Sequence, residues 1–227
     1  MPTVLITGAN RGLGLEFVKQ YAEAGWNVLA CCRQPDAATS LKETDGNVSL
    51  HALDVCDFGA VDQLAQNLSD TPIDVLINNA GAFGPRGEAI SEISYGEWEE
   101  VLRINILAPT KIASAFLPHI EKSDQKKIVF ISSIMGSVGN NSVGGEYIYR
   151  SSKAGLNGVI KSLSLDVMLK NIAVLALHPG WVQTDMGGAN AAITPSESIT
   201  GMRKVIDGLS MENTGQFYSY DGTDIPW

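Results

Sequence analysis

Residues 3–14 read Thr-Val-Leu-Ile-Thr-Gly-Ala-Asn-Arg-Gly-Leu-Gly, an apolar run that breaks into a turn with glycines at positions 8, 12 and 14. Apolar side chains then recur at helical spacing, at Leu13, Phe17, Tyr21 and Ala24. The stretch therefore predicts a strand, a glycine turn and a helix. A helix N-terminus that follows a glycine turn offers free N–H groups to a pyrophosphate.

Each glycine of the turn has its own physical use. Gly8 permits the positive φ of a tight turn, Gly12 lets a phosphate approach the backbone, and Gly14 lets the helix lie close to the sheet. The spacing is G-x-x-x-G-x-G rather than the commoner G-x-G-x-x-G. Glycines also make plain strand-to-helix turns, but a place after the first strand of a parallel sheet favours dinucleotide binding. Asn10, Arg11 and Leu13 lie in the same turn and are candidate cofactor contacts.

Strands and helices alternate along the rest of the chain. Six more apolar runs predict strands at residues 26–31, 48–53, 73–77, 128–131, 172–177 and 216–220. Helical patterns surround Leu41 and cover 61–68, 95–119, 147–170 and 197–209. Pro109 is expected to kink or break the helix at 95–119. We predict an α/β fold of Rossmann type, a doubly wound parallel sheet of about seven strands with helices on both faces. Residues 1–227 are expected to form one domain, with loops 82–94 and 181–196 building the substrate site.

Composition excludes several classes of function. The 227 residues are 44% hydrophobic and 18% charged, which is typical of a globular protein. A net charge of -9 argues against binding to nucleic acid or to an anionic membrane, because no basic face is available. There are three cysteines, Cys31, Cys32 and Cys56, and this odd number with an adjacent pair argues against a disulfide framework. No cluster of histidines and cysteines has the spacing of metal ligands. We see no signal peptide and no membrane span, and expect a cytoplasmic protein without a metal.

The end of the second predicted strand bears on the choice of cofactor. A carboxylate there would suit the ribose 2′-hydroxyl of NAD, whereas cations suit the 2′-phosphate of NADP. The strand ends in Cys31-Cys32-Arg33, with no acidic residue at its tip. Arg33, joined by Arg11 from the glycine turn, predicts a preference for NADP(H) over NAD(H). The alternative is that both arginines are merely solvated.

Tyr149 and Lys153 stand four residues apart in a predicted helix and so share one face. A nearby ammonium favours the phenolate, so we expect Lys153 to lower the pKa of Tyr149 towards neutrality. Such a tyrosine can act as a general acid or base. Taken alone, the pair also occurs by chance on solvated helices.

Together these motifs resemble the short-chain dehydrogenase/reductase family over almost the whole chain. The matching pieces are the glycine turn, Leu53-Asp54-Val55, Asn78-Asn79-Ala80-Gly81, Asn105, Ser132-Ser133, Tyr149 with Lys153, and Pro179-Gly180 followed by Thr184. Within the family, the segments 132–137, 144–153, 178–182 and 220–223 look most like the subgroup of sniffer carbonyl reductases and C-factor proteins.

The resemblance implies a role for each matching position. The adenine would be held by Asp54 and Val55. The cofactor would also pass along Asn79, Ala80 and Gly81, while Lys153 would bind the nicotinamide ribose beside Tyr149. The nicotinamide would face Pro179, Gly180, Val182 and Thr184.

Two further catalytic roles are implied by the resemblance. Ser133 would steady the substrate oxygen, and Asn105 would sit at a helix kink and hold a water that links Lys153 to solvent. The interval from Ser133 to Tyr149 is longer than is usual in the family, so the loop 139–145 must bulge. Otherwise Ser132 or Ser137 becomes the candidate. For Asn105 the alternative is a helix-breaking residue beside Pro109, and for Asp54 it is a helix cap.

The expected activity is NADPH-dependent reduction of a carbonyl to an alcohol, with Tyr149 as proton donor. Walls from Ala82–Pro85, Ile134, Met135 and Trp181 suggest a hydrophobic aldehyde or ketone, although Trp181 could instead be packed in the core. The alternatives are a C-factor-like signalling or scaffold protein that binds NAD(P), and an NADP-dependent alcohol dehydrogenase working in the oxidative direction. The two long helices, around residues 95–121 and 147–170, commonly form subunit contacts in such a family, so we expect a homodimer or homotetramer, with a monomer as the alternative.

Overall fold

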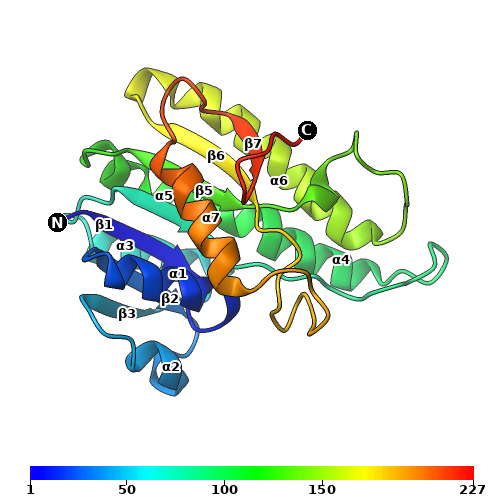
Figure 1. Ribbon diagram of the computed structural model, residues 1–227, viewed down its shortest axis with the longest axis horizontal. Helices are drawn as coiled ribbons and strands as arrows, with labels where there is room; N and C mark the ends of the chain where they lie inside the picture. The colour runs from blue at the N-terminus through cyan, green and yellow to red at the C-terminus, as the bar shows by residue number, and fades with distance from the viewer.

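A computed structural model describes all residues of the chain, 1–227, and its centre is one parallel sheet of seven strands in the order β3-β2-β1-β4-β5-β6-β7 (Figure 1). The strands are β1 (Thr3–Thr7), β2 (Asn27–Cys32), β3 (Val48–Ala52), β4 (Val75–Asn78), β5 (Lys127–Ile131), β6 (Ala173–His178) and β7 (Gln216–Ser219). Every neighbouring pair is parallel. The predicted doubly wound α/β fold is therefore confirmed.

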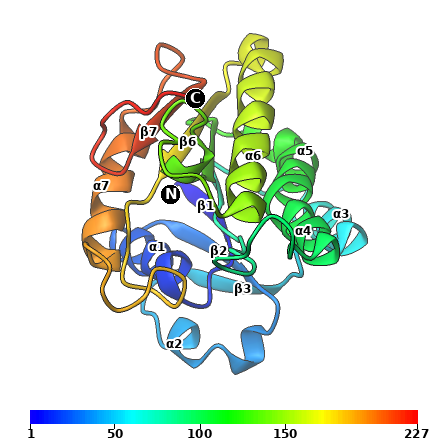
Figure 2. The same cartoon turned by 90° about the vertical axis from the view of Figure 1, so that its right-hand side faces the viewer.

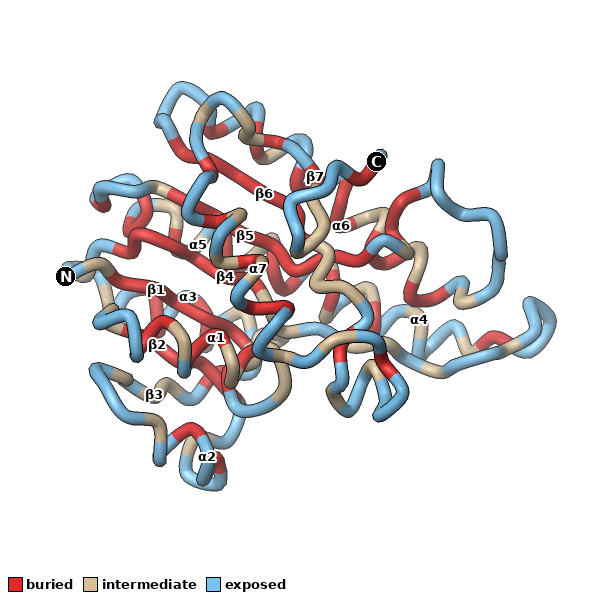
Figure 3. The backbone as a smooth tube through the Cα atoms, viewed as in Figure 1, coloured by how far each residue is buried: buried red, intermediate tan, exposed pale blue.

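Helices cover both faces of the sheet (Figure 2). One layer contains α1 (Gly12–Glu23), α7 (Pro195–Asp207) and the short α2 (Thr39–Lys42). The other contains α3 (Phe58–Asn67), α5 (Ala108–Glu121) and α6 (Tyr147–Asp166), with α4 (Tyr95–Leu102) beside α6. The five inner strands are buried, whereas the edge strands β3 and β7 are mostly half-buried or exposed (Figure 3). Residues of the inner strands alternate between the two layers: Val4 and Ile6 pack in the layer of α1 and α7, and Leu5 packs in the layer of α3 and α5.

The strand order fixes where a ligand can bind. The chain moves outward from β1 to β3, then returns to place β4 on the other side of β1. At such a reversal the loops that leave two neighbouring strands diverge, and a crevice forms outside their carboxyl ends. Here those loops begin at Gly8 after β1 and at Asn79 after β4.

The long helix expected at residues 95–119 is interrupted upstream of Pro109. A π-helical turn, Arg103–Leu107, joins α4 to α5, and Pro109 lies in the first turn of α5. Proline has no N–H, so it cannot donate to the carbonyl of Asn105 as an α-helical residue would. A π turn absorbs the break without separating the two helices.

Two other predicted helices have different limits. The pattern over 147–170 predicted one helix, but α6 ends at Asp166 and a 3₁₀ turn, Met168–Lys170, leads to Asn171 at a left-handed φ of 54°. The last helix begins before residue 197 because Thr194 and Glu197 form a capping box around Pro195.

No helix is both long enough and apolar enough to cross a membrane. All three cysteines are free thiols, with Cys31 and Cys32 buried in β2. Burial raises the pKa of Cys31 to about 12, which suits a packed side chain rather than a nucleophile.

Candidate functional site

The glycine turn after β1 shapes a cradle that side chains would fill. Gly8 and Gly12 have positive φ values of 65° and 53°, a region that favours glycine. A Cβ on Gly14 would lie 2.1 Å from the carbonyl oxygen of Gly8, so only glycine fits where α1 approaches the sheet. No side chain caps the N-terminus of α1, which leaves its N–H groups available to an anion.

Asn79 joins the end of β4 to this turn. Its Nδ2 donates to the carbonyl oxygens of Thr7 at 2.8 Å and of Gly8 at 3.2 Å. The backbone N–H groups of Asn79 and Ala80 both donate to Thr7 Oγ1, each at 3.1 Å. The carboxyl ends of the two central strands are thus tied together, and the crevice between their loops has a fixed floor.

Arg33 and Asp54 follow the ends of the neighbouring strands β2 and β3, where Leu53 N–H bonds to the carbonyl of Cys32. Asp54 Oδ1 accepts from the N–H of Cys56 at 2.9 Å, while the cap of α3 is Asp57, which accepts from Ala60. The helix-cap alternative for Asp54 is therefore wrong. Arg33 is exposed and forms no ion pair. Val55 is partly buried beside Asp54.

Arg11 takes a different partner from the one expected. Its Nη1 lies 2.8 Å from Asp185 Oδ2, in the loop after β6, rather than standing free beside Arg33. The same loop brings Thr184 to the glycine turn, since a Cβ on Gly12 would lie 3.5 Å from Thr184 Cγ2. Asn10 is exposed and Leu13 half-buried within the turn.

The three serines near β5 have three different surroundings. Ser132 Oγ donates to Asn157 Oδ1 at 2.6 Å in the core. Ser137 Oγ donates to the carbonyl of Pro226. Ser133 Oγ accepts from the backbone N–H of Met135 at 3.2 Å, and of the three serine hydroxyls it is the one that acts on the pKa of Tyr149. The exposed segment after Ser137 absorbs the extra residues of the long interval, as the sequence required.

Tyr149, in the first turn of α6, is 8% exposed. Burial raises its pKa to about 12, and the Ser133 hydroxyl and the charge of Arg86 only partly oppose this rise. The predicted lowering by Lys153 is therefore wrong for this structure. The reason is geometric: Lys153 Nζ lies 5.7 Å from the Tyr149 ring centroid and donates to the carbonyl of Ile131 at 2.9 Å.

Lys153 is itself buried, and burial lowers its pKa to about 8. A Cβ on Gly81 would lie 3.7 Å from its Nζ and 3.2 Å from Asn105 Oδ1. The lysine, the loop after β4 and the π turn therefore meet at one place, directly beside Tyr149. Glycine at position 81 keeps that place open.

Asn105 is 1% exposed, and its side chain is fully engaged. Oδ1 accepts from Ala82 N–H at 2.9 Å, and Nδ2 donates to the Ala82 carbonyl at 2.7 Å and to Ser152 Oγ at 2.9 Å. The amide thus joins the loop after β4 to α6. It does more than break a helix beside Pro109.

The loop after β4 covers Tyr149. The ring of Phe83 stacks on that of Tyr149 with centroids 4.2 Å apart and planes 17° apart. Arg86 lies over Phe83, 3.8 Å from its centroid, and donates to the carbonyl of Met186. The loops after β4 and β6 therefore meet above the tyrosine.

The segment after β6 turns at Gly180, whose φ is 83°. Ser198 Oγ donates to the carbonyl of Pro179 at 2.6 Å, and Val182 is 4% exposed. Trp181 is not packed in the core: it is 58% exposed and donates to the carbonyl of Gly187 at 2.8 Å. The tryptophan is thus part of the loop over the site.

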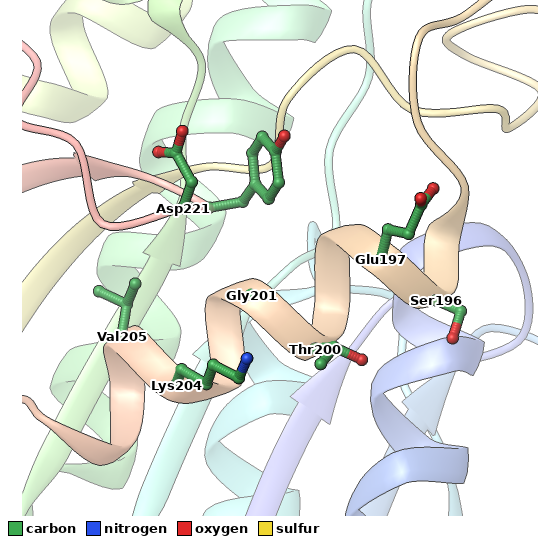
Figure 4. A pocket seen from close by; sticks show the side chains of 8 residues that line it. Ser196, Glu197, Thr200, Gly201, Lys204, Val205 and Asp221 are labelled. Carbon is green, nitrogen blue, oxygen red and sulfur yellow. The ribbon is translucent and has the colours of Figure 1, made fainter.

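A groove of about 610 Å³ lies elsewhere, between α7 residues 196–205 and the turn Tyr220–Asp221 (Figure 4). None of the candidate residues lines it. No hydrogen bond joins a hydroxyl of this groove to a carboxylate or to Lys204 within it, and the groove lies apart from Tyr149.

Three residues that contribute to the site were missed from sequence. Ser152 is fully buried against Asn105, while Arg86 and Asp185 hold the two loops. Only Ser152 carried a usable signal, as a polar residue next to Lys153 on the inner side of a helix. Arg86 and Asp185 are loop charges without a periodic pattern.

Comparisons with known proteins agree with this geometry. The family model described as short chain dehydrogenase matches residues 2–193. The C-signal protein of Myxococcus xanthus is 42% identical over 163 residues, which cover 72% of this chain and 98% of that protein. The structure of the carbonyl reductase Sniffer of D. melanogaster matches with a TM-score of 0.93 and 34% identity, covering 100% of both chains. The NADPH-bound carbonyl reductase from chicken fatty liver matches with a TM-score of 0.91 and 34% identity, covering 100% of this chain and 94% of that one.

Proposed function

This chain belongs to the short chain dehydrogenase family and is an oxidoreductase of that family, and on this premise we propose that it reduces an aldehyde or ketone with NADPH. One observation carries the proposal: Ser133 and Lys153 flank Tyr149 at the carboxyl edge of a parallel sheet, beside a glycine turn. Proton donor, oxyanion partner and cofactor cradle then share one crevice.

Tyr149 is the proton donor. The phenol carries its proton at neutral pH, as a proton donor in the reductive direction must, and burial, which raises its pKa to about 12, makes it a weaker acid than an exposed tyrosine. Ser133 donates to the developing oxyanion from the same side. Lys153 holds the nicotinamide ribose, and Asn105 orients α6 and the loop after β4 around these groups.

The residues present fit a dinucleotide. The uncapped N-terminus of α1 and the side-chain-free surface at Gly8 and Gly12 suit a pyrophosphate. Gly81 leaves open the place beside Lys153. Asp54 and Val55 would receive the adenine. The rest of the cofactor site would be lined by Ala80, Pro179, Gly180, Val182 and Thr184. When bound, the nicotinamide supplies the hydride.

The preference for NADPH rests on Arg33. It is exposed at the tip of β2, it has no carboxylate partner, and no acidic residue stands there to bind a ribose 2′-hydroxyl. Arg11 can join it after releasing Asp185. The similar carbonyl reductase from chicken fatty liver, whose crystal structure has NADPH bound, supports the same choice.

The substrate wall is apolar and aromatic. Phe83 lies on Tyr149, and Met135 and Trp181 stand on the neighbouring loops. A carbonyl compound with a hydrophobic body fits such a wall. The loops 82–94 and 181–196 supply it, so the substrate site and the cofactor site belong to one unit.

The test is a screen of aldehydes and ketones with NADPH and NADH side by side, followed as loss of reduced cofactor. We expect turnover with NADPH that Tyr149→Phe lowers by about 10²–10⁴-fold while the variant still binds NADPH. Near-normal turnover by Tyr149→Phe would defeat the assignment of the proton donor. Equal turnover with NADH at equal concentration would defeat the cofactor preference.

The 42% identity with C-signal favours a second candidate, a signalling or scaffold protein that binds NAD(P) with catalysis secondary. It predicts cofactor binding without carbonyl reduction by the wild type. The same screen therefore separates the two. Oxidation of an alcohol by the same site requires Tyr149 to lose its proton, so that direction should need alkaline pH.

A further inference from the structure

Arg86 lies in a three-layer stack with Phe83 and Tyr149. Its guanidinium carbon is 3.8 Å from the Phe83 centroid, and the Tyr149 centroid is 4.2 Å from the same point. Two groups that close to one ring occupy opposite faces, so Phe83 is the middle layer. The guanidinium carbon is then at most about 8 Å from the centre of the Tyr149 ring.

No carboxylate neutralises this cation. The structure has four ion pairs, which join Arg11 to Asp185, Lys42 to Asp36, Lys111 to Asp62 and Lys170 to Glu121. The one hydrogen bond from Arg86 goes to the neutral carbonyl of Met186. Because guanidinium has five N–H donors, the others remain free on an exposed side chain.

The acidic residues nearest along these segments are Asp185, Glu88 and Glu146, and none pairs with Arg86: Asp185, next to Met186, is held by Arg11. Glu88 and Glu146 line a separate small hollow with Pro85 and Ile148, and neither pairs with Arg86. The charge of Arg86 does reach the active phenol, since it acts to lower the pKa of Tyr149. Arg86 is therefore close enough to Tyr149 for one substrate to contact both residues, with an anionic group at Arg86 and the reacting carbonyl at Tyr149.

We propose that Arg86 is a specificity-determining residue that binds a carboxylate on the far end of the carbonyl substrate. This inference rests on the proposed function and narrows its substrate class to oxo acids with an apolar body. The carboxylate would lie at the guanidinium of Arg86 and the carbonyl at the hydroxyl of Tyr149, and since Phe83 stands between these two residues, several bonds must separate the two groups of the substrate. An aromatic or short aliphatic spacer would lie along Phe83.

The experiment compares two aldehydes of equal shape, 4-formylbenzoate and the neutral 4-formylbenzamide. With NADPH, we expect Arg86→Gln to lower kcat/KM for the carboxylate by roughly 10- to 100-fold, mainly through KM, and for the amide by less than about 3-fold. Arg86→Lys should recover part of the loss. Lys122→Gln is the matched control, because Lys122 is also an exposed cation that donates to a carbonyl, that of Ser69, at the far end of α5.

A binding measurement makes the test independent of turnover. Titration calorimetry of 4-(hydroxymethyl)benzoate into the protein with NADP⁺ should show a dissociation constant that rises in Arg86→Gln and not in Lys122→Gln. If the wild type reduces both aldehydes and Arg86→Gln changes them equally, the inference fails and the proposed function stands. If the wild type reduces no compound of the carbonyl screen but binds the acid through Arg86, the proposed function fails and the anion site stands. Arg86-independent binding overturns the inference in either case.

Discussion

Phe83 lies flat on Tyr149, with ring centroids 4.2 Å apart and ring planes at 17°. The contact takes the phenol out of water, and burial is the largest cause of the rise in the pKa of Tyr149 to about 12. The raised pKa extends the range in which the phenol is protonated further into alkaline pH. It also means that the loop after β4 adjusts the chemistry of a residue on α6.

Phe83→Ala should lower the pKa of Tyr149 from about 12 towards its ordinary value of about 10, because water would reach the phenol. The measurement is an ultraviolet titration of tyrosinate, with the Tyr149→Phe form subtracted to isolate one residue. Phe58→Ala is the control, since Phe58 also carries an arginine over its ring, Arg103 at 4.6 Å. If the pKa of Tyr149 does not change in Phe83→Ala, then other residues packed around Tyr149, and not Phe83, keep water from the phenol.

Alanine substitutions of the three serines near β5 should differ in whether they lower the catalytic rate or the stability of the fold. Ser133→Ala should lower kcat by about 10–10³-fold, because an oxyanion donor is lost, and should cost about 0.5–2 kcal/mol in stability, because Ser133 Oγ also accepts from the N–H of Met135. Ser132→Ala should cost about 1–3 kcal/mol in the free energy of unfolding, since it leaves Asn157 Oδ1 buried without its donor. Ser137→Ala should leave the rate intact. Single-turnover rates and urea unfolding check the set, and a larger rate loss in Ser132→Ala would reassign the catalytic serine.

Much of this fold could be predicted from residue patterns, because burial and steric constraints determine which residue types occur at each position of a strand, turn or helix. Val4, Leu5 and Ile6 are all 0% exposed, so a strand covered on both faces appears as an unbroken apolar run. Gly14 was predictable for a steric reason, since a Cβ there meets the Gly8 carbonyl. The proximity of Tyr149 and Lys153 followed from helical periodicity alone.

Other features depend on contacts that no local pattern encodes. The sequence shows that Lys153 is near Tyr149, but not that Phe83 buries the phenol or that Lys153 donates to Ile131. Burial therefore reversed the expected direction of the pKa change. Arg11 was expected beside Arg33, but a residue 174 positions away, Asp185, holds it in this structure.

The charge on Lys153 should make stability depend on pH. Burial lowers the pKa of Lys153 from 10.5 to about 8, so between these values the unfolded chain binds the proton more than the folded chain does. The wild type should therefore gain stability relative to Lys153→Met as pH rises through this window, by on the order of 3 kcal/mol. Urea unfolding of both proteins from about pH 7 to about pH 10.5 measures the difference.

Comparison with Lys153→Met removes the contributions of other groups. Burial raises the pKa values of Cys31 and Tyr21, which lowers stability at alkaline pH, but both residues are present in the two proteins. A difference in unfolding free energy that does not vary with pH would mean that Lys153 keeps its ordinary pKa in the folded state.

The cofactor preference should respond to Arg33 and Asp185 in opposite directions. Arg33→Ala removes a charge-assisted bond to the 2′-phosphate and should weaken NADPH binding by roughly 10- to 100-fold. Asp185→Asn frees Arg11 from a pair whose side chains are 69% and 79% exposed. Exposed pairs contribute at most about 1 kcal/mol, so NADPH should bind no more than about 5-fold tighter in that variant.

NADH is the internal control for both variants, because it lacks the 2′-phosphate and its dissociation constant should hardly change. Fluorescence titration of each reduced cofactor at low and high salt provides the measurement. The effect of Arg33→Ala on NADPH should shrink at high salt, since the lost contact is between charges. If NADPH and NADH weaken equally in Arg33→Ala, Arg33 supports the adenine end as a whole and the selectivity must come from Arg11. In that event Asp185→Asn should still favour NADPH, because it acts only by releasing Arg11.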